Sequence, residues 1–190
     1  MNTISSRVAR RVLASALVVT TLILPGVSPR PAAAATPVPP TCHGKVATLV
    51  AAPGATSIRG TQGDDVIVAR SGNIRIDAGG GNDVVCAGPG DNIINAGAGN
   101  DWIDAGDGNN TVDTGAGDFN IVYAGSGDDV IVGNQGDDVA YGGDGDNLVS
   151  LQGGNDVLVT GSGDDRLWGA KGIDTCDPGT GNDHVGACEN

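Results

Sequence analysis

The chain has 190 residues, of which 33 are glycine, and 23 acidic residues against 10 basic ones give a net charge of −13 at pH 7. A strongly negative chain disfavours nucleic acid and anionic lipid as partners and favours cations. Aromatic residues make up only 3% of the chain, and an acidic composition of this kind is compatible with disorder. The order of the residues therefore decides whether the chain folds.

The first 35 residues are typical of a secretory signal peptide. Arg7, Arg10 and Arg11 precede an apolar stretch at 12–24, and small residues suited to cleavage follow at 33–35. The apolar stretch is shorter than the ~20 residues of a membrane-spanning helix, although an uncleaved anchor is an alternative. We therefore expect a secreted, extracellular protein that does not insert into the membrane after cleavage. The adjacent Arg10 and Arg11 leave the choice between general and twin-arginine export open.

A nine-residue repeat begins at Gly60 and continues to Gly186, with a single extra residue near 119–123. The fourth position of each of the fourteen rows is glycine, and the fifth is Asn or Asp in every row except the one that has Ile173. The eighth position is always small or apolar: Ile67, Ile76, Val85, Ile94, Ile103, Val112, Ile121, Ile131, Ala140, Val149, Leu158, Leu167, Cys176 and Val185. A repeat of this regularity overrides any local interpretation of the sequence.

The repeat predicts an all-β fold. Glycine beside Asn or Asp favours a tight turn over the first six positions, and an apolar residue between variable ones favours a short strand over the last three. Stacked with two rows per coil, such strands form a right-handed parallel β-roll, a β-solenoid with two short parallel sheets and the eighth positions between them. We expect a linker and N-terminal cap at 36–59, the roll at 60–186, and a C-terminal tail at 187–190.

The rows resemble the G-G-x-G-x-D-x-U-x nonapeptide of RTX (hemolysin-type) proteins, a calcium-binding β-roll repeat. The stretches 79–85 (GGGNDVV) and 161–167 (GSGDDRL) carry the resemblance, which covers residues 60–186. RTX repeats usually lie near the C-terminus of large toxins or proteases. This chain is more similar to the small stand-alone secreted bacterial form, so the resemblance implies calcium binding without a toxin or protease activity.

In RTX rolls the ion lies between neighbouring turns on the same edge, and its ligands come from rows two apart. The position-six residues of the odd rows are Asp65, Asp83, Asp101, Phe119, Asp138, Asp156 and Asp174. Those of the even rows are Ile74, Asn92, Asn110, Asp129, Asn147, Asp165 and Asp183. We call these two series the odd-row edge and the even-row edge. The extra residue near Phe119 lets Asp118 or Asn120 take its place.

Five pairs have Asp on both sides and predict about five strong Ca²⁺ sites: Asp65/Asp83, Asp83/Asp101, Asp138/Asp156, Asp156/Asp174 and Asp165/Asp183. An Asn offers a neutral oxygen and cannot offset the charge of the ion, so the even-row edge, Asp129 included, is expected to bind more weakly or not at all. The alternative is that the position-six residues only cap turns through ladders of hydrogen bonds.

The four cysteines, Cys42, Cys86, Cys176 and Cys188, favour disulfides in an exported chain. Three connectivities are possible, and proximity in sequence favours Cys42–Cys86 and Cys176–Cys188, each holding an end segment over a terminal coil. A zinc site is the alternative. Neither His43 nor His184 has the partner that a general base needs, and we predict no enzymatic activity.

A calcium-stabilised structural or binding protein is therefore the leading hypothesis for function. A carbohydrate- or cell-surface-binding module is the alternative, and an extracellular lyase or epimerase is less favoured. Valines and aromatic residues at positions seven and nine of the odd rows form an apolar strip on the outer face, which predicts self-association or surface docking. The residues of this strip are Val66, Val68, Val84, Trp102, Val122, Val139, Tyr141, Val157 and Val159.

Overall fold

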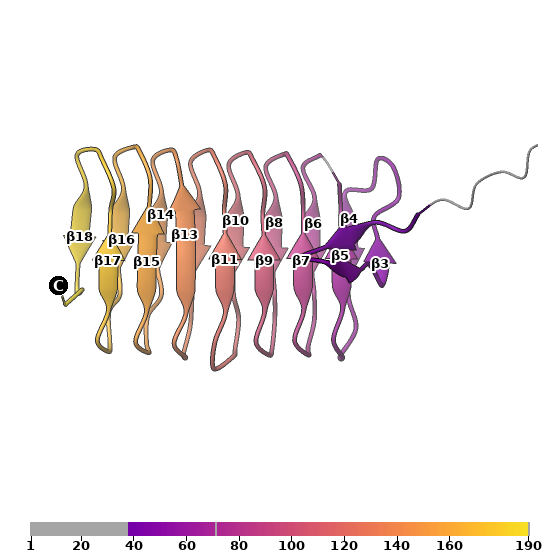
Figure 1. Ribbon diagram of the computed structural model, residues 1–190, viewed down its shortest axis with the longest axis horizontal. Helices are drawn as coiled ribbons and strands as arrows, with labels where there is room; N and C mark the ends of the chain where they lie inside the picture. Colours follow the sequence, from indigo (N-terminus) through magenta and orange to yellow (C-terminus); the bar gives the residue numbers. More distant parts are fainter. Residues whose placement is uncertain (1–37, 71, 190) are drawn as a thin grey trace, which may run out of the picture. The chain divides into compact units, whose positions relative to one another are not determined.

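A computed structural model describes residues 38–70 and 72–189 of the chain. The signal peptide expected at 1–35 lies outside these residues. All the regular secondary structure of the described part is β (Figure 1). No helix long and apolar enough to cross a membrane occurs in it.

The chain winds into a coil that passes alternately through two parallel sheets (Figure 1). One sheet contains β3 (Leu49–Val50), β5 (Val66–Val68), β7 (Val84–Cys86), β9 (Trp102–Asp104), β11 (Ile121–Tyr123), β13 (Val139–Gly143), β15 (Val157–Thr160) and β17 (Thr175–Asp177). The other contains β4 (Ser57–Arg59), β6 (Arg75–Asp77), β8 (Ile93–Asn95), β10 (Thr111–Asp113), β12 (Val130–Val132), β14 (Leu148–Ser150), β16 (Arg166–Trp168) and β18 (His184–Gly186). The predicted all-β solenoid with two short parallel sheets is confirmed.

The core between the sheets is built from two positions of the repeat. The eighth position is buried as predicted, with Ile67, Ile103 and Leu158 all 0% exposed. The first position also points inward, although the sequence assigned it to the turn: Ala78, Ala87, Ala96, Ala105, Thr114, Ala124, Leu151 and Thr160 are buried there. Small side chains suit this position because it lies where the chain turns from one sheet into the other and space is narrow.

Two expectations about the eighth position are wrong. The extra residue of the seventh row, which lies on the odd-row edge, shifts the strand by one, so that Val122 pairs with Ile103 and is 1% exposed, while Ile121 lies on the outer face. The same shift leaves Phe119 exposed and brings Asn120 to position six. In the last row, Val185 is 38% exposed because no further coil packs against it.

The turns are paired with one another as well as the strands. Residues at position three of consecutive coils form parallel bridges, as between Gly80 and Ala98 and between Gly153 and Lys171. The backbone N–H of Gly81 donates to the carbonyl of Ala98 at 2.8 Å, and the same contact recurs along the coil. Hydrogen bonds between coils therefore surround the whole winding and are not confined to the sheets.

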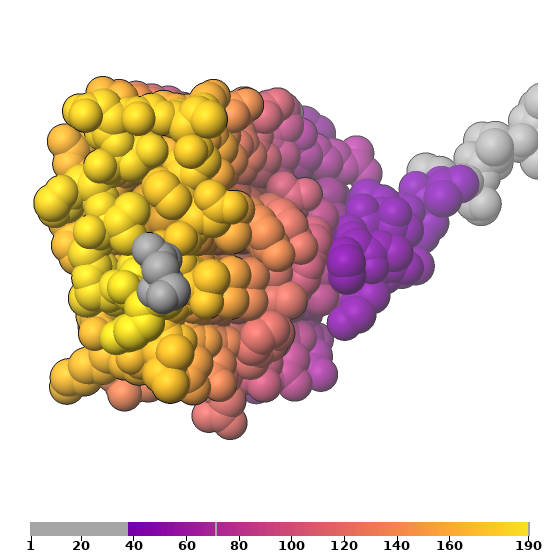
Figure 2. Space-filling model, turned by 60° about the vertical axis from the view of Figure 1, so that its left-hand side comes forward, coloured from indigo at the N-terminus to yellow at the C-terminus, as the bar shows by residue number. Residues whose placement is uncertain are grey.

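An N-terminal hairpin covers the start of the odd-row sheet. Strands β1 (Thr41–Cys42) and β2 (Lys45–Val46) pair antiparallel, and the hairpin stands out from the side of the coil in indigo (Figure 2). Cys42 is bonded to Cys86 and packs in one cluster with Val68 and Val84. The predicted outer strip is thus partly wrong: Val68 and Val84 are buried by the hairpin, and Val122 belongs to the core. Self-association through the rest of the strip stays a prediction.

The second disulfide closes the other end of the coil. Cys176 at position eight of the last odd row is bonded to Cys188, with the two Cα atoms 6.0 Å apart. The structure therefore contains both of the disulfides that sequence proximity favoured. Each joins a segment outside the repeat to a strand of the odd-row sheet.

Gly154 illustrates why position four is always glycine. Its φ of 134° lies in a region that side chains rarely adopt, and an added Cβ would lie 1.9 Å from the carbonyl oxygen of Gly136 in the preceding coil. Its neighbour Gly153 has no such constraint, since a Cβ there would only approach the Gln135 side chain, at 3.3 Å.

We expect Gly154→Ala to lower the free energy of unfolding by more than about 2 kcal/mol, because it adds backbone strain and displaces the stacked turn. The matched variant Gly153→Ala should cost less than about 1 kcal/mol. Urea unfolding of the two variants in saturating calcium measures the difference, and equal losses would show that the stacking constraint at position four is wrong.

Candidate metal centres

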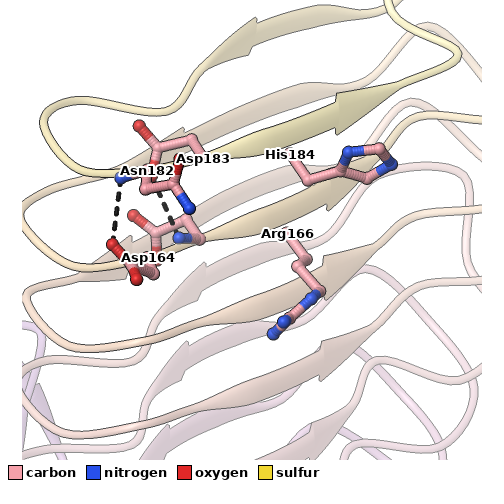
Figure 3. A pocket seen from close by; sticks show the side chains of 6 residues that line it. Asp164, Arg166, Asn182, Asp183 and His184 are labelled. Carbon is pink, nitrogen blue, oxygen red and sulfur yellow. Dashed lines mark hydrogen bonds between the residues drawn. The ribbon is translucent and has the colours of Figure 1, made fainter.

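The position-six residues form a ladder along each edge of the coil. The backbone N–H of each residue donates to the Oδ1 atom of the position-six residue one coil later, eighteen residues on. The distance is 2.8 Å from Asp65 to Asp83 and 2.8 Å from Asp138 to Asp156. Figure 3 shows the corresponding contact near the end of the even-row edge, where the N–H of Asp165 meets Asp183 at 3.0 Å. The ladder brings together all five of the Asp pairs that the sequence singled out.

Position five forms a second ladder that runs in the opposite direction. Its side chain accepts a hydrogen bond from the backbone of the following coil, as Asp164 does from the N–H of Asn182 at 2.9 Å (Figure 3). Asp64 and Asn82 make the same contact at 2.7 Å on the odd-row edge. These side chains are exposed. Turn capping therefore accounts for the acidic residues at position five.

Capping does not account for position six, because only one carboxylate oxygen is used. The second oxygen, Oδ2, is buried and accepts no hydrogen bond in seven residues: Asp83, Asp101, Asp129, Asp138, Asp156, Asp165 and Asp174. All seven are 2% exposed or less. A buried carboxylate oxygen without a partner costs several kcal/mol (about 1–3 for a neutral group and more for a charged one). Seven turns therefore each contain a buried carboxylate oxygen that has no hydrogen-bond partner.

Burial also raises the pKa values of five of these carboxyl groups, those of Asp83, Asp101, Asp129, Asp138 and Asp156. Desolvation is the main cause at Asp83, whose pKa is raised to about 7, with the charges of Asp101, Asp65 and Asp64 adding to it. Desolvation likewise raises the pKa of Asp129 and of Asp156 to about 6. Perturbed carboxyl groups in a repeated, water-poor turn are typical of sites that bind a cation.

The donor set fits a hard cation such as Ca²⁺, which prefers six to eight oxygen ligands. The described residues contain no group of three or more His, Cys, Asp or Glu side chains that could hold a metal. Each turn therefore offers one buried carboxylate oxygen together with the backbone carbonyls of its glycines. Such an all-oxygen set suits calcium and does not suit zinc, and the cysteines are consumed in disulfides.

Two of the predicted ligands differ from the rest. The Oδ2 atom of Asp65 already accepts hydrogen bonds from the backbone N–H and the hydroxyl of Thr61, at 2.6 and 2.9 Å. Asp183 lies in the last even row, is half-buried and has no unpaired buried oxygen. Asp65 lies in the first row of the repeat and Asp183 in the last.

Sequence reasoning missed one carboxylate of the odd-row ladder. Glu189 accepts a hydrogen bond from the N–H of Asp174 at 2.9 Å, which is the contact that a position-six Asp of a further coil would make. The nearby Cys176–Cys188 disulfide carries the chain end back to this edge. The only signal in the sequence was an acidic residue directly after a paired cysteine.

A hollow of about 380 Å³ beside these ladders lies at the end of the even-row edge, lined by Asp164, Asp165, Arg166, Asn182, Asp183 and His184. Arg166 and His184 point along the outer face of the sheet and away from the acidic residues (Figure 3). The His184 ring lies against Trp168, with centroids 5.7 Å apart, and His43 stacks on Trp102 at 4.2 Å. Both histidines therefore pack on aromatic rings of the outer faces.

The stacked coil and its repeated carboxylate turns define a parallel β-solenoid of the cation-binding class. A family model, the RTX calcium-binding nonapeptide repeat, matches residues 51–85, 87–118, 119–149 and 150–185. The chain therefore belongs to the RTX calcium-binding repeat family, and its fold is the calcium-binding β-roll. Comparison with curated proteins and with solved structures found no match.

In the absence of calcium, we expect the folded chain to lose stability as the pH rises from about 5 to about 7.5. An unfolded Asp ionises near pH 4, whereas Asp83 in the folded chain ionises at about 7. The folded state therefore binds more protons over this interval, and its stability falls with rising pH. Calcium reverses the sign, because it binds the ionised carboxylates.

Urea unfolding at the two pH values, with calcium and with excess chelator, measures this effect. Trimethylamine N-oxide can be added equally to all samples if the chelated chain needs it to fold. Asp83→Asn removes the most strongly shifted group and should flatten the pH dependence of the chelated chain. A chelated wild type that is more stable at the higher pH would contradict the assignment of buried, unpaired carboxylates.

Proposed function

We propose that the protein is a secreted calcium-ion-binding protein whose fold is held by Ca²⁺ between stacked turns, and that the metal has a structural role. The observation that carries the proposal is the row of seven buried Oδ2 atoms that accept no hydrogen bond. A divalent ion at each turn removes the cost of burying these charges. The residues proposed to hold calcium are those seven Asp, with Asp65 and Asp183 contributing at the ends.

Charge crowding makes the metal a requirement of the fold. Without residues 1–35 the chain carries 6 basic and 23 acidic residues, a net charge of −17. The coil places these charges on top of one another, as the charges of Asp138 and Asp174 on either side of Asp156 illustrate by helping to raise its pKa. Each bound Ca²⁺ cancels two charges at the place where they are most concentrated. Binding to the folded state alone then stabilises it by mass action.

Export is supported by the cysteines and by the N-terminal sequence pattern. All four cysteines are paired, and disulfides persist in oxidising compartments. Extracellular fluids also supply calcium at the concentrations that weak extracellular sites need, on the order of 10⁻⁴–10⁻³ M. The location and the metal are thus mutually consistent.

The carbohydrate-binding alternative gains no support from the aromatic residues of the odd-row face. Tyr123 and Tyr141 stack on each other with centroids 4.8 Å apart, and Trp102 lies 5.5 Å from Tyr123. A sugar ring needs a free aromatic face, whereas Tyr123 and Tyr141 each turn a face toward the other. Their role is to join successive coils by aromatic packing.

We expect the chain lacking residues 1–35 to be largely unfolded in excess chelator and to gain β structure when calcium is added. The reason is the cost of stacking unpaired carboxylates between coils. Far-UV circular dichroism during a calcium titration, followed by chelation, checks this, with magnesium as the control ion. The signal should be assigned to the central coils by hydrogen exchange, because the disulfides can keep the ends compact. An unchanged spectrum and melting temperature in chelator would rule out a structural role for the metal.

The two edges should differ in their calcium binding. Asp156 has Asp138 and Asp174 as its neighbours in the ladder, whereas Asp129 has Asn110 and Asn147. Asp156→Ala should therefore lose more bound calcium than Asp129→Ala, since it disturbs two all-carboxylate contacts. Isothermal titration calorimetry of both variants gives the number of ions lost. Equal losses would mean that each turn binds its ion independently of its neighbours.

A further inference from the structure

Three asparagines at position six make contacts that no aspartate could make. The side-chain amide nitrogen, Nδ2, of Asn92 donates to the carbonyls of Gly88, Gly90 and Ala105 at 2.9, 2.8 and 3.0 Å. These are positions two and four of its own row and position one of the row in the next coil. Asn110 repeats all three contacts and Asn147 repeats two: Gly106, Gly108 and Ala124 at 2.9, 2.9 and 3.2 Å, and Gly143 and Gly145 at 3.1 and 2.9 Å.

The partners on each side fix the orientation of these amides. The Oδ1 atom of Asn92 accepts the backbone N–H of Ile74, and that of Asn110 accepts the N–H of Asn92. The other atom of each amide faces carbonyl oxygens, which can only accept. It must therefore be the NH₂ group.

An aspartate turn has the same geometry with an oxygen in place of this nitrogen. Asp129 lies between Asn110 and Asn147 on the even-row edge and accepts the N–H of Asn110 through Oδ1 at 2.7 Å. Gly125 and Gly127 of its row have φ values of 103° and 123°, against 82° and 120° for Gly106 and Gly108 in the Asn110 row. Its Oδ2 atom is buried and unpaired. An acceptor thus occupies the place where asparagine puts a donor, among carbonyls that are also acceptors.

We propose that the amide groups of Asn92, Asn110 and Asn147 take the place of the calcium ion in their turns. These turns therefore bind no metal and keep their structure without it. The inference rests on the proposed function, because it assigns to calcium the same carbonyls that the amide contacts. The partial positive charge of the NH₂ hydrogens satisfies those carbonyls, and the neutral side chain adds no repulsion between coils. The residue at position six then determines whether a turn depends on metal. A turn with Asp needs calcium, and a turn with Asn is stable without it.

Asn120 marks the limit of this rule. It follows the extra residue of its row, and its Nδ2 atom donates to Oδ1 of Asp138 at 3.0 Å, with no carbonyl of its own turn as a partner. The amide thus replaces the ion only where the nine-residue turn is intact. The turns closed by an amide are therefore confined to the even-row edge, and the odd-row turns that have a buried, unpaired carboxylate depend on calcium.

Substitution in both directions at neighbouring positions of one edge tests the proposal. Asp129→Asn supplies an amide to the one aspartate turn among the three asparagine turns, and Asn110→Asp removes an amide from its neighbour. Asp129→Ala removes the same charge without providing a donor. Asp128→Asn, one residue away at exposed position five, makes the same change of charge outside the buried turn and keeps the ladder acceptor that it offers to Asp146.

The stability of all four variants is first measured in excess chelator, as the midpoint of urea unfolding, or of folding by trimethylamine N-oxide if the chelated chain is unfolded. Asp129→Asn should be stabilised, equivalent to a rise in melting temperature of about 4 °C or more, and Asn110→Asp should be destabilised. Asp129→Ala and Asp128→Asn should not show the stabilisation expected for Asp129→Asn. Equal midpoints for Asp129→Asn and Asp129→Ala, or no loss in Asn110→Asp, would overturn the proposal.

Calcium calorimetry then separates this proposal from the proposed function. Asp129→Asn should bind fewer ions than the wild type, Asn110→Asp should bind more, and Asp128→Asn should match the wild type. A wild type that binds no calcium would refute the proposed function and leave the chelator measurements standing. Calcium binding by the wild type with an unchanged stoichiometry in Asn110→Asp would refute the amide substitution alone.

Discussion

The structure depends on one constraint, the register in which residues eighteen positions apart lie side by side, or nineteen apart where the coil contains the extra residue. This register buries the first and eighth positions between the sheets and pairs the turns through their backbones. It also places each position-six side chain against another of its kind. Acidic side chains therefore meet in a water-poor turn, and the core that stabilises the fold cannot form without bringing them together. In the function that we propose, calcium offsets this repulsion.

The two ladders divide the acidic residues into an exposed group that caps turns and a buried group that we propose to bind calcium. At position five the carboxylate is exposed and its hydrogen bond is sufficient, as for Asp164. At position six one oxygen serves the ladder and the other is left buried, as for Asp156. The residue type is the same, and only burial separates the roles. Residue type alone therefore does not separate the two groups, whereas burial and hydrogen bonding do so turn by turn.

Sequence alone predicted what the repeat encodes locally: the glycine at position four, the apolar residue at position eight, the two sheets and the Asp pairs. It could not predict what depends on a contact with the next coil. Alanine at position one looked like part of a turn until Ala96 and Ala105 proved buried. The burial of Val84 depends on a hairpin outside the repeat, and the ladder contact of Glu189 depends on a disulfide. Asparagine at position six was expected to bind calcium more weakly or not at all, and the sequence pattern does not show which way its amide points.

The opposite directions of the two ladders make each coil interchangeable with its neighbours, since every coil gives and receives the same hydrogen bonds on both sides. An insertion or deletion of eighteen residues inside the coil preserves every contact type and changes only the length. A change of nine residues is different in kind. It moves all later rows to the opposite edge. Asp138 and Asp156 would then lie on the same edge as Asn110, and so would the break at Asn120. Length variation in steps of one coil is thus structurally neutral, while half a coil exchanges the chemistry of the two edges.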